Sequence, residues 1–225
     1  MILGSRLDAV TKLLAETENN TLFADVGSDH AFLAIETIKR GIAKKAICSD
    51  INKMPLLKGK ENAQKYSFPI DFILSDGFDS FDDLPVTSAA ICGMGGELIS
   101  SIVLRSKIAH NALLVLQPMS AQDELRKILW DNGFEIKKEI FVTEARKPYT
   151  VMQVIFTGKR TDYNYIDLYL GKERVPTEDF INYCKKILIA AEKRRLGIIA
   201  RGESTTDVDL LIKLCQEQTT SFSGQ

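Results

Sequence analysis

The stretch TLFADVGSDH, residues 21–30, contains the feature that decides the fold. A short apolar run leads into Asp25-Val26-Gly27, and apolar residues then recur at helical spacing until Gly41. Apolar runs of this length are typical of buried strands, and glycine allows the chain to turn sharply between a strand and a helix. The stretch therefore predicts a strand that ends near Gly27 and a helix that follows it directly.

The same alternation continues to residue 156. Further apolar runs cover residues 45–49, 70–74, 88–92 and 113–116. Uniformly apolar strands separated by helices indicate a parallel sheet covered on both faces. The last two runs, 134–142 and 149–156, are separated only by a turn around residues 146–148, which predicts an antiparallel hairpin. We therefore expect a Rossmann-like α/β fold with five parallel strands and a terminal antiparallel hairpin.

The pattern changes after residue 158. Residues 159–176 are polar, and apolar residues then recur every three or four positions from Thr177 onward, with a break at Gly202. This spacing predicts two amphipathic helices joined by a short turn, a coiled-coil-like hairpin. We expect a Rossmann-like domain over residues 1–158 and a helical hairpin over residues 159–225. The hairpin is too short to form a sizeable core, so it should pack on the main domain or face a partner.

The composition is that of an ordinary soluble protein, with 45% hydrophobic and 26% charged residues. No stretch approaches the roughly 20 apolar residues that cross a bilayer, and the first residues do not resemble a signal peptide. The cysteines and histidines are few and scattered, so we expect free thiols and no metal site. These six residues are Cys48, Cys92, Cys184, Cys215, His30 and His110. We expect a cytoplasmic protein, a monomer, with neither a membrane nor a metal partner.

The formal net charge of −1 hides a local excess of basic residues. Residues 159–201 contain 10 basic and 6 acidic side chains, whereas the segment after them is acidic. Such a region can contact the phosphates of a nucleic acid. It can equally be a solvated helix face, and the charge pattern alone does not separate the two interpretations.

The residues at the ends of the predicted strands carry the functional information, because ligands of doubly wound sheets bind there. Gly27 is a single glycine where a dinucleotide site requires three, which argues against a pyrophosphate ligand. Asp50 follows the second strand and can accept hydrogen bonds from both hydroxyls of a ribose. Either residue alone can also belong to an ordinary turn.

The third and fourth strand ends are Ser75-Asp76-Gly77 and Gly93-Met94-Gly95-Gly96. An acceptor such as Asp76 beside a backbone amide suits the edge of an adenine, although Asp-Gly is also a common turn. The cluster of glycines permits close approach of a flat ligand, and Met94 can pack on its face. Taken together, the four strand ends have the order found in the cofactor site of class I methyltransferases.

The resemblance extends to one family. Residues 25–33 (DVGSDHAFL), 75–78 (SDGF), 91–96 (ICGMGG) and 116–118 (LQP) resemble the bacterial tRNA (adenine-22-N1)-methyltransferases, TrmK. The similarity covers about residues 1–157 and, more loosely, the helical tail. It implies S-adenosyl-L-methionine as cofactor, tRNA as partner, and methylation of N1 of adenine 22. This chain has Met119 where the family has Asn, and Ser75 where Gly is frequent.

We expect Asp29 to be the catalytic residue, because it lies just beyond the cofactor turn and can accept a hydrogen bond from N6 of the target adenine. It can alternatively bind the cofactor's amine or cap a helix. The expected cofactor-binding residues are Asp25, Gly27, Ser28, His30, Asp50, Ile51, Asp76, Gly77, Phe78, Cys92 and Gly93. Those expected to bind substrate are Met94, Gly95, Gly96, Gln117, Pro118, Tyr149, Lys185, Lys186, Arg194 and Arg195.

Phe78, Tyr149 and Met94 are also expected to offer stacking surfaces to a base extruded from the tRNA. Two other functions remain open from the sequence. The acceptor can be another RNA base, a protein or a small molecule, or the chain can be a non-catalytic RNA-binding protein with a methyltransferase fold. A nicotinamide dehydrogenase is disfavoured by the missing glycines and the terminal hairpin.

Overall fold

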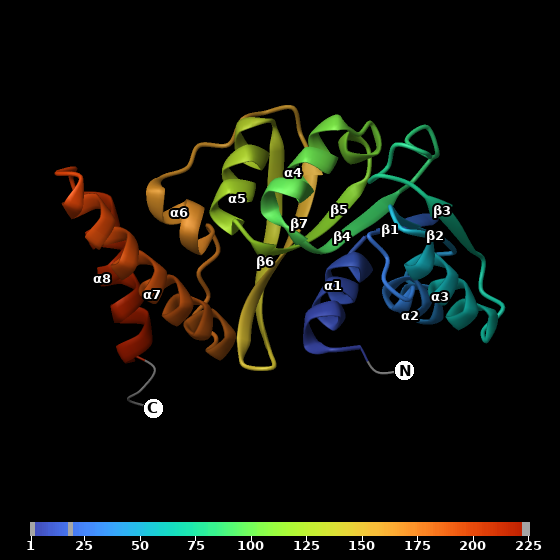
Figure 1. Ribbon diagram of the computed structural model, residues 1–225, viewed down its shortest axis with the longest axis horizontal. Helices are drawn as coiled ribbons and strands as arrows, with labels where there is room; N and C mark the ends of the chain where they lie inside the picture. The colour runs from blue at the N-terminus through green and yellow to red at the C-terminus, as the bar shows by residue number, and fades with distance from the viewer. Residues whose placement is uncertain (1–2, 18–19, 222–225) are drawn as a thin grey trace.

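A seven-stranded sheet forms the centre of the computed structural model, which describes residues 3–17 and 20–221 (Figure 1). The strand order is β3-β2-β1-β4-β5-β7-β6. Strands β1 to β5 are parallel, and β7 is antiparallel to both of its neighbours. The predicted fold of five parallel strands and a terminal hairpin is confirmed. The strands are β1 (Leu22–Val26), β2 (Lys45–Asp50), β3 (Ile70–Leu74), β4 (Ser88–Gly95), β5 (Leu113–Ser120), β6 (Phe134–Glu144) and β7 (Lys147–Phe156).

The hairpin differs from the prediction in its turn. The chain reverses at Ala145 and Arg146, whose φ angles are 48° and 64°. Lys147 and Pro148, which the sequence places in the turn, already pair with β6. Positive φ at both central residues matches the twist of a two-residue hairpin, so the turn can be this short. It is β7, the second strand of the hairpin, that pairs with β5.

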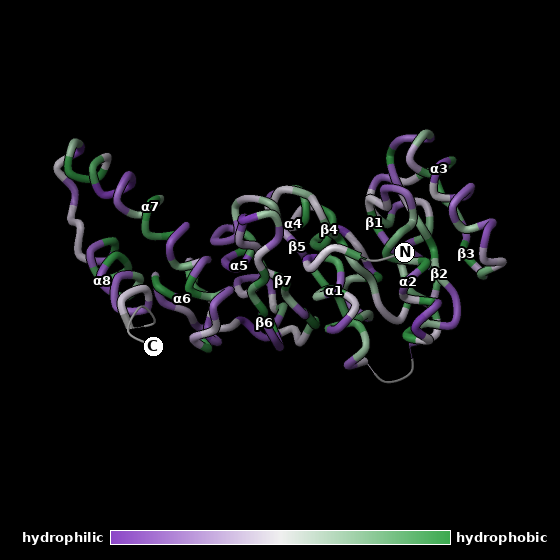
Figure 2. The backbone as a smooth tube through the Cα atoms, turned by 90° about the horizontal axis from the view of Figure 1, so that it is seen from below, coloured by the Kyte–Doolittle hydropathy of each residue, from purple (hydrophilic) through white to green (hydrophobic). Residues whose placement is uncertain are grey.

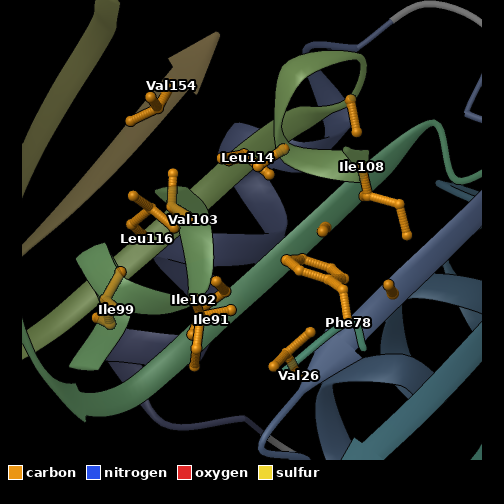
Figure 3. Close-up of a cluster of buried hydrophobic side chains, with 14 of the residues drawn as sticks. Val26, Phe78, Ile91, Ile99, Ile102, Val103, Ile108, Leu114, Leu116 and Val154 are labelled. Atoms are coloured by element: carbon orange, nitrogen blue, oxygen red, sulfur yellow. The ribbon is translucent and has the colours of Figure 1, made fainter. Parts of the chain in front are cut away.

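Helices cover both faces of the sheet. One face carries α1 (Ser5–Ala15), α2 (Phe32–Lys39) and α3 (Lys53–Gln64). The other carries α4 (Gly96–Arg105), η1 (Ile108–His110) and α5 (Gln122–Asp131). Successive residues of each strand enter different cores: Leu114 packs with the α4 side, shown in Figure 3, and Val115 with the α1 side. This alternation explains why the strands read as uninterrupted apolar runs.

The tail packs beyond the β6 edge of the sheet. It contains α6 (Tyr165–Leu170), which the sequence did not predict, and the two expected helices, α7 (Glu178–Ala200) and α8 (Thr206–Ser221). Hydrophobic and hydrophilic segments alternate along α7 (Figure 2). Its apolar residues form a third core with α6, α8 and Phe141 of β6. No helix in the described residues is both long and apolar enough to cross a membrane.

Buried polar contacts attach the tail to the rest of the molecule. Arg126 of α5 is fully buried and pairs with Glu139 of β6, with an Nη2–Oε1 distance of 2.6 Å. The same guanidinium donates to the backbone oxygen of Leu168 in α6 at 2.5 Å and to the Tyr183 hydroxyl of α7 at 3.4 Å. Thr150 of β7 also donates to Glu139. One ion pair thus connects the sheet edge with two tail helices.

Candidate functional site

The carboxyl ends of β1 to β4 lie at one edge of the sheet and surround two hollows that share Gly27. The first hollow, of about 280 Å³, is lined by Arg6, Leu7, Asp25, Gly27, Ser28, Asp29, Phe32, Leu33, Cys92 and Gly93. The second hollow, of about 170 Å³, is lined by Val26, Gly27, Asp50, Ile51, Ser75, Asp76, Gly77, Met94, Leu98 and Ile102. Gly27, Asp50 and Asp76 therefore lie around one hollow, as the sequence predicts.

Gly27 shapes the boundary between the two hollows. Its φ is +73°, a conformation that side chains disfavour, and the amides of Gly27 and Ser28 donate to the Ser49 carbonyl at 2.8 and 2.9 Å. A Cβ at this position would overlap the terminal methyl group of Met94. The absence of a side chain therefore lets the Met94 methyl group lie against the turn.

Asp25 is a buried carboxyl group in the wall of the first hollow. Only 5% of the residue is exposed, and Ser28 Oγ donates to its Oδ2 at 2.7 Å. Burial raises the pKa of Asp25 to about 6, against the opposing effect of hydrogen bonds from Ser28 and from the backbone of Ala34. Burial, and then the nearby Asp25, also raise the pKa of the Cys92 thiol. Cys92 is thus a neutral thiol in the same wall.

Asp29 lies in the first hollow as an exposed carboxylate. Its side chain is 73% exposed, and Oδ1 is 3.2 Å from Nε2 of His30. The His30 ring stacks on Phe32 at a centroid distance of 5.3 Å, and Asn62 donates to the His30 carbonyl at 3.1 Å. His30 itself is not among the residues that line either hollow. The His30 ring contacts the Asp29 carboxylate from outside the first hollow.

The acidic residues of the second hollow differ in their contacts. Asp50 Oδ1 accepts a hydrogen bond from the amide of Asn52 at 2.7 Å, and Ile51 beside it is 66% exposed. Asp76 is paired with Arg105 of α4, whose Nη2 donates to Oδ1 at 2.5 Å and to the backbone oxygen at 3.1 Å. Asp79 Oδ1 accepts a hydrogen bond from Nε of the same guanidinium at 3.1 Å. The Asp76 carboxylate in the second hollow is thus already paired with the Arg105 guanidinium.

Three of the residues expected to bind cofactor or substrate have buried side chains, and their roles stay predictions. Phe78 is 1% exposed and lies in the α4-side core (Figure 3). Its ring is in edge contact with the Phe81 ring. Gln117 is fully buried, and its Oε1 accepts hydrogen bonds from the Gly93 amide at 3.2 Å and from Arg6 Nη1 at 2.5 Å. Pro118, next to it, is buried as well. None of the three lines a hollow.

The glycines of the fourth strand end have separate roles. Gly93, at φ +79°, lines the first hollow and receives the Gln117 contact. Gly95 is half-buried beside Ser120. Gly96 is buried at the start of α4, where a Cβ would overlap the carbonyl oxygen of Ala121, and its expected contact with substrate stays a prediction. Close packing of α4 on the β5–α5 connection requires this glycine.

Two arginines near the site were not found from the sequence. One is Arg105 of α4, which pairs with Asp76 and Asp79. Arg6 of α1 lies in the first hollow, and its guanidinium is 5.6 Å from the centre of the Tyr149 ring. This contact places the predicted Tyr149 behind Arg6. No local motif marks either arginine, since each is a basic residue on an amphipathic helix.

The four basic tail residues expected to bind substrate do not form one free surface. Lys185 is exposed, whereas Lys186 is half-buried 5.7 Å from the Tyr183 ring, and burial and Arg126 lower its pKa. Arg194 lies 4.8 Å from the Tyr169 ring centre and 3.7 Å from Asp123. Arg195 pairs with Asp209 at 2.5 Å.

No group of three or more His, Cys, Asp or Glu side chains within residues 3–17 and 20–221 is placed to hold a metal ion. All four cysteines, which fall in this part of the chain, are free thiols. The groups that line the two hollows include carboxylates, the Arg6 guanidinium, the Cys92 thiol and backbone.

Comparison with known proteins agrees with this geometry. The family model described as "Methyltransferase domain" matches residues 3–152. A "Putative tRNA methyltransferase" of Mycoplasma pneumoniae is 32% identical over 163 residues, which cover 70% of this chain and 74% of the relative. The tRNA (adenine(22)-N(1))-methyltransferase of Bacillus subtilis is 28% identical over 173 residues, 75% of this chain and 71% of the relative. The chain belongs to the TrmK family.

A solved TrmK-type structure covers nearly the whole chain. It is the Streptococcus pneumoniae "putative tRNA (m1A22) methyltransferase" in complex with S-adenosyl-L-methionine. The sequence identity is 29%, the TM-score is 0.78, and the match covers 95% of this chain and 98% of that one. The likeness therefore includes the helical tail as well as the sheet.

Proposed function

We propose that this chain transfers a methyl group from S-adenosyl-L-methionine to N1 of an adenine in tRNA, at the position numbered 22 in the B. subtilis relative. The observation that carries the proposal is the arrangement of Gly27, Asp50 and Asp76 around one hollow at the carboxyl edge of the sheet. The membership in the TrmK family and the cofactor bound by the S. pneumoniae relative support it.

The residues present fit this cofactor. Gly27 lines both hollows, so a ligand that spans them would pass along this turn. Asp50 faces the second hollow and would accept the ribose hydroxyls, and Asp76 would accept from the exocyclic amine of the adenine. The amino-acid arm would then lie in the first hollow. When bound, the cofactor supplies an electrophilic methyl group on a sulfonium ion.

The protein's contribution to the reaction is mainly positioning. N1 of neutral adenine already has a free lone pair, so the reaction needs no strong base. Exact alignment of the two reactants can supply most of the acceleration. Gly93 and Met94 at the fourth strand end would present a flat surface to the extruded base, and Asp29 would accept a hydrogen bond from its N6. The negative charge of the Asp29 carboxylate would stabilise the positive charge that develops on the adenine ring.

The tail would supply the contacts to tRNA. Lys185 and Lys193 are exposed on α7, and no ion-pair partner occurs for either among the described residues. Arg194 and Arg195, by contrast, already contact acidic side chains of the protein. The role of the tail in RNA binding, its division from the first 158 residues, the cytoplasmic location and the monomeric state stay predictions.

Mass spectrometry of nucleosides tests the proposal directly. The purified protein is incubated with S-adenosyl-L-methionine and unmodified tRNA transcripts, which are then digested. We expect 1-methyladenosine, and none from a transcript in which the target adenine is replaced by guanine. A different modified nucleoside would show that the acceptor is another one. Absence of cofactor binding by calorimetry would favour the non-catalytic alternative.

The role of Asp29 has its own test. Asp29→Ala should retain its affinity for the cofactor and lose methyl transfer by about 100-fold, because it removes one stabilising group from the transition state. Asp71→Ala, at an exposed position of β3, serves as the matched control and should behave as wild type. Near-normal turnover by Asp29→Ala would exclude the proposed role.

A further inference from the structure

Arg105, the last residue of α4, makes three hydrogen bonds to the turn that follows β3. Its Nη2 donates to Oδ1 of Asp76 at 2.5 Å and to the backbone oxygen of the same residue at 3.1 Å. Its Nε donates to Oδ1 of Asp79 at 3.1 Å. A Cβ placed on Gly77 would lie 3.3 Å from Nη2, so the guanidinium lies close against the backbone of the turn. One side chain therefore holds both a carboxylate and a peptide group at the wall of the second hollow.

These contacts differ from an ordinary ion pair on a surface. An isolated pair of exposed side chains contributes little, because holding two mobile groups in one geometry costs entropy. The Asp76 and Arg105 side chains are 61% and 35% exposed, but here one planar guanidinium contacts three acceptors, and one of them belongs to the backbone. Arg105 also projects from a helix that Ile102, one turn earlier, anchors in the core. The guanidinium thus has a fixed base from which to orient the exposed Asp76 carboxylate.

The other contacts of the turn do not hold the Asp76 side chain. The Ser80 amide donates to Ser75 Oγ at 3.0 Å, and the Ser80 hydroxyl donates to the Leu74 oxygen at 3.1 Å. These two hydrogen bonds join the ends of the turn. In the part of the chain that the structure describes, only Arg105 makes a hydrogen bond to the Asp76 carboxylate. The orientation of this carboxylate therefore depends on Arg105.

Two hydrogen-bonding groups of the turn remain available to a ligand. Across the described ranges, no residue donates a hydrogen bond to Asp76 Oδ2 or accepts one from the Gly77 amide. The N–H of a trans peptide points away from its C=O, so the contact between Arg105 and the Asp76 oxygen directs the Gly77 amide away from Arg105. The edge of adenine carries a donor, the 6-amino group, next to an acceptor, N1. A free carboxylate oxygen beside a free amide matches this pair.

We propose that Arg105 is a positioning residue for the purine ring of the cofactor and that it sets the preference for adenine over a 6-oxopurine. By holding the side chain and the backbone oxygen of Asp76, it fixes the acceptor and the donor that read the adenine edge. The inference rests on the proposed function, since it takes the adenosyl group as the occupant of the second hollow. Hypoxanthine has an oxygen at C6 and a hydrogen on N1, so both groups of the turn would meet the wrong partner.

Calorimetry with S-adenosylhomocysteine and S-inosylhomocysteine tests the proposal without a reaction. The two ligands differ only at C6 and N1 of the purine, so the ratio of their affinities reports on this edge alone. Wild type should prefer the adenosyl ligand by about 10- to 100-fold, the range for a hydrogen bond to a charged group. Arg105→Met should weaken adenosyl binding and reduce the preference to about threefold, the value of a weak hydrogen bond, because the Asp76 carboxylate then moves freely.

Lys107 offers a matched control close to the same turn. Its Nζ lies 2.8 Å from Oδ1 of Asp83, so Lys107→Met removes one positive charge without removing a contact to Asp76. The preference of Lys107→Met should equal that of wild type. Arg105→Lys keeps the charge but not the planar fork, and it should recover only part of the preference. If Arg105→Met fails to fold, Asp79→Ala removes one of the three acceptors that hold the guanidinium and should lower the preference by about two- to fivefold.

Several results would overturn the proposal. If Arg105→Met kept the wild-type preference, with or without a loss of overall affinity, Arg105 would only support the shape of the turn. The same loss of preference in Lys107→Met would assign the effect to charge alone. Unchanged binding of both ligands with weaker tRNA binding would assign Arg105 to an RNA phosphate. A wild-type protein that binds neither ligand would refute the proposed function and this inference with it, whereas the other results leave the proposed function intact.

Discussion

Replacing Asp25 by Asn should stabilise the ligand-free protein at neutral pH. Asp25 is buried in the wall of the first hollow, and Ser28 donates a hydrogen bond to it. An amide oxygen can accept the same hydrogen bond, and the two side chains have nearly the same shape. Asp25→Asn therefore removes the charge, keeps the hydrogen bond from Ser28 and loses the smaller contribution of the Ala34 amide.

The size of the effect follows from the pKa of Asp25. Burial raises this pKa from the ordinary value near 3.8 to about 6. The difference corresponds to about 3 kcal/mol against the ionised form in the folded protein. With a change of about 2–4 °C per kcal/mol for a chain of this size, the melting temperature of Asp25→Asn should rise by about 6–12 °C at pH 8.

The sign reverses the usual behaviour of an aspartate. Below about pH 3.8 Asp25 is protonated in both the folded and the unfolded chain, and it has no effect on the pH dependence. Between this value and about 6 the folded chain binds a proton that the unfolded chain has released, so the free energy of unfolding falls as pH rises. Above about pH 6 the full loss is present.

Urea unfolding of wild type and Asp25→Asn across pH 4–8 provides the measurement. The difference between the two proteins isolates this one carboxyl group, because all other titrating groups are shared. The advantage of Asp25→Asn should be near zero at pH 4 and reach about 3 kcal/mol at pH 8. Asp71→Asn, at an exposed position of β3, is the matched control for the substitution itself. An Asp25→Asn variant no more stable than wild type at pH 8 would refute the reasoning.

Three further predictions concern packing, the buried ion pair and the tail. Gly96→Ala should lower the free energy of unfolding in urea by about 1–3 kcal/mol, because its Cβ would overlap the Ala121 carbonyl oxygen. The control Gly197→Ala, in α7, should be neutral or stabilising. Arg126→Met should lower the free energy of unfolding by about 3–5 kcal/mol, because it leaves Glu139 buried and unpaired. The double variant Arg126→Met with Glu139→Leu should recover most of this loss. A double variant as unstable as the single one would contradict this reasoning. Lys185→Ala with Lys193→Ala should weaken tRNA binding and flatten its salt dependence in a filter-binding titration, and an unchanged slope would remove these lysines from the interface.

The sequence predicts the strand ends well, because both signals are local. An apolar run shows where a strand is buried, and the glycine or acid after it shows where the chain reaches the sheet edge, as at Gly27 and Asp50. The pairing of β7 between β5 and β6 has no such signal. Either strand of a hairpin can pair with a neighbouring sheet, and only the packing of the whole fold decides which one does.

The directions of the side chains at the site are harder to predict from the sequence. Phe78 follows Asp76-Gly77 at the sheet edge, but the direction of a side chain after a turn depends on the backbone angles there, and Gly77 at φ +60° turns it into the core. Gln117, which the family resemblance implies as a substrate-binding residue, has its side chain directed to the Gly93 amide and to Arg6. Arg6 was missed because its contacts come from β4, β5 and β7, far along the chain.

The structure also bears on how the tail would take part in catalysis. The Arg126–Glu139 pair joins α5 and β6 to α6 and α7, and Asp179 near the start of α7 accepts a hydrogen bond from the Thr143 amide of β6 at 2.8 Å. Strand β6 runs parallel to β5, so Thr143 lies near the same edge of the sheet as the two hollows. The base of α7 is thus anchored at the edge where the adenine would enter. A tRNA held on α7 would reach Asp29 at a position set by these contacts, and loosening them should lower turnover even where binding of S-adenosylhomocysteine is unchanged.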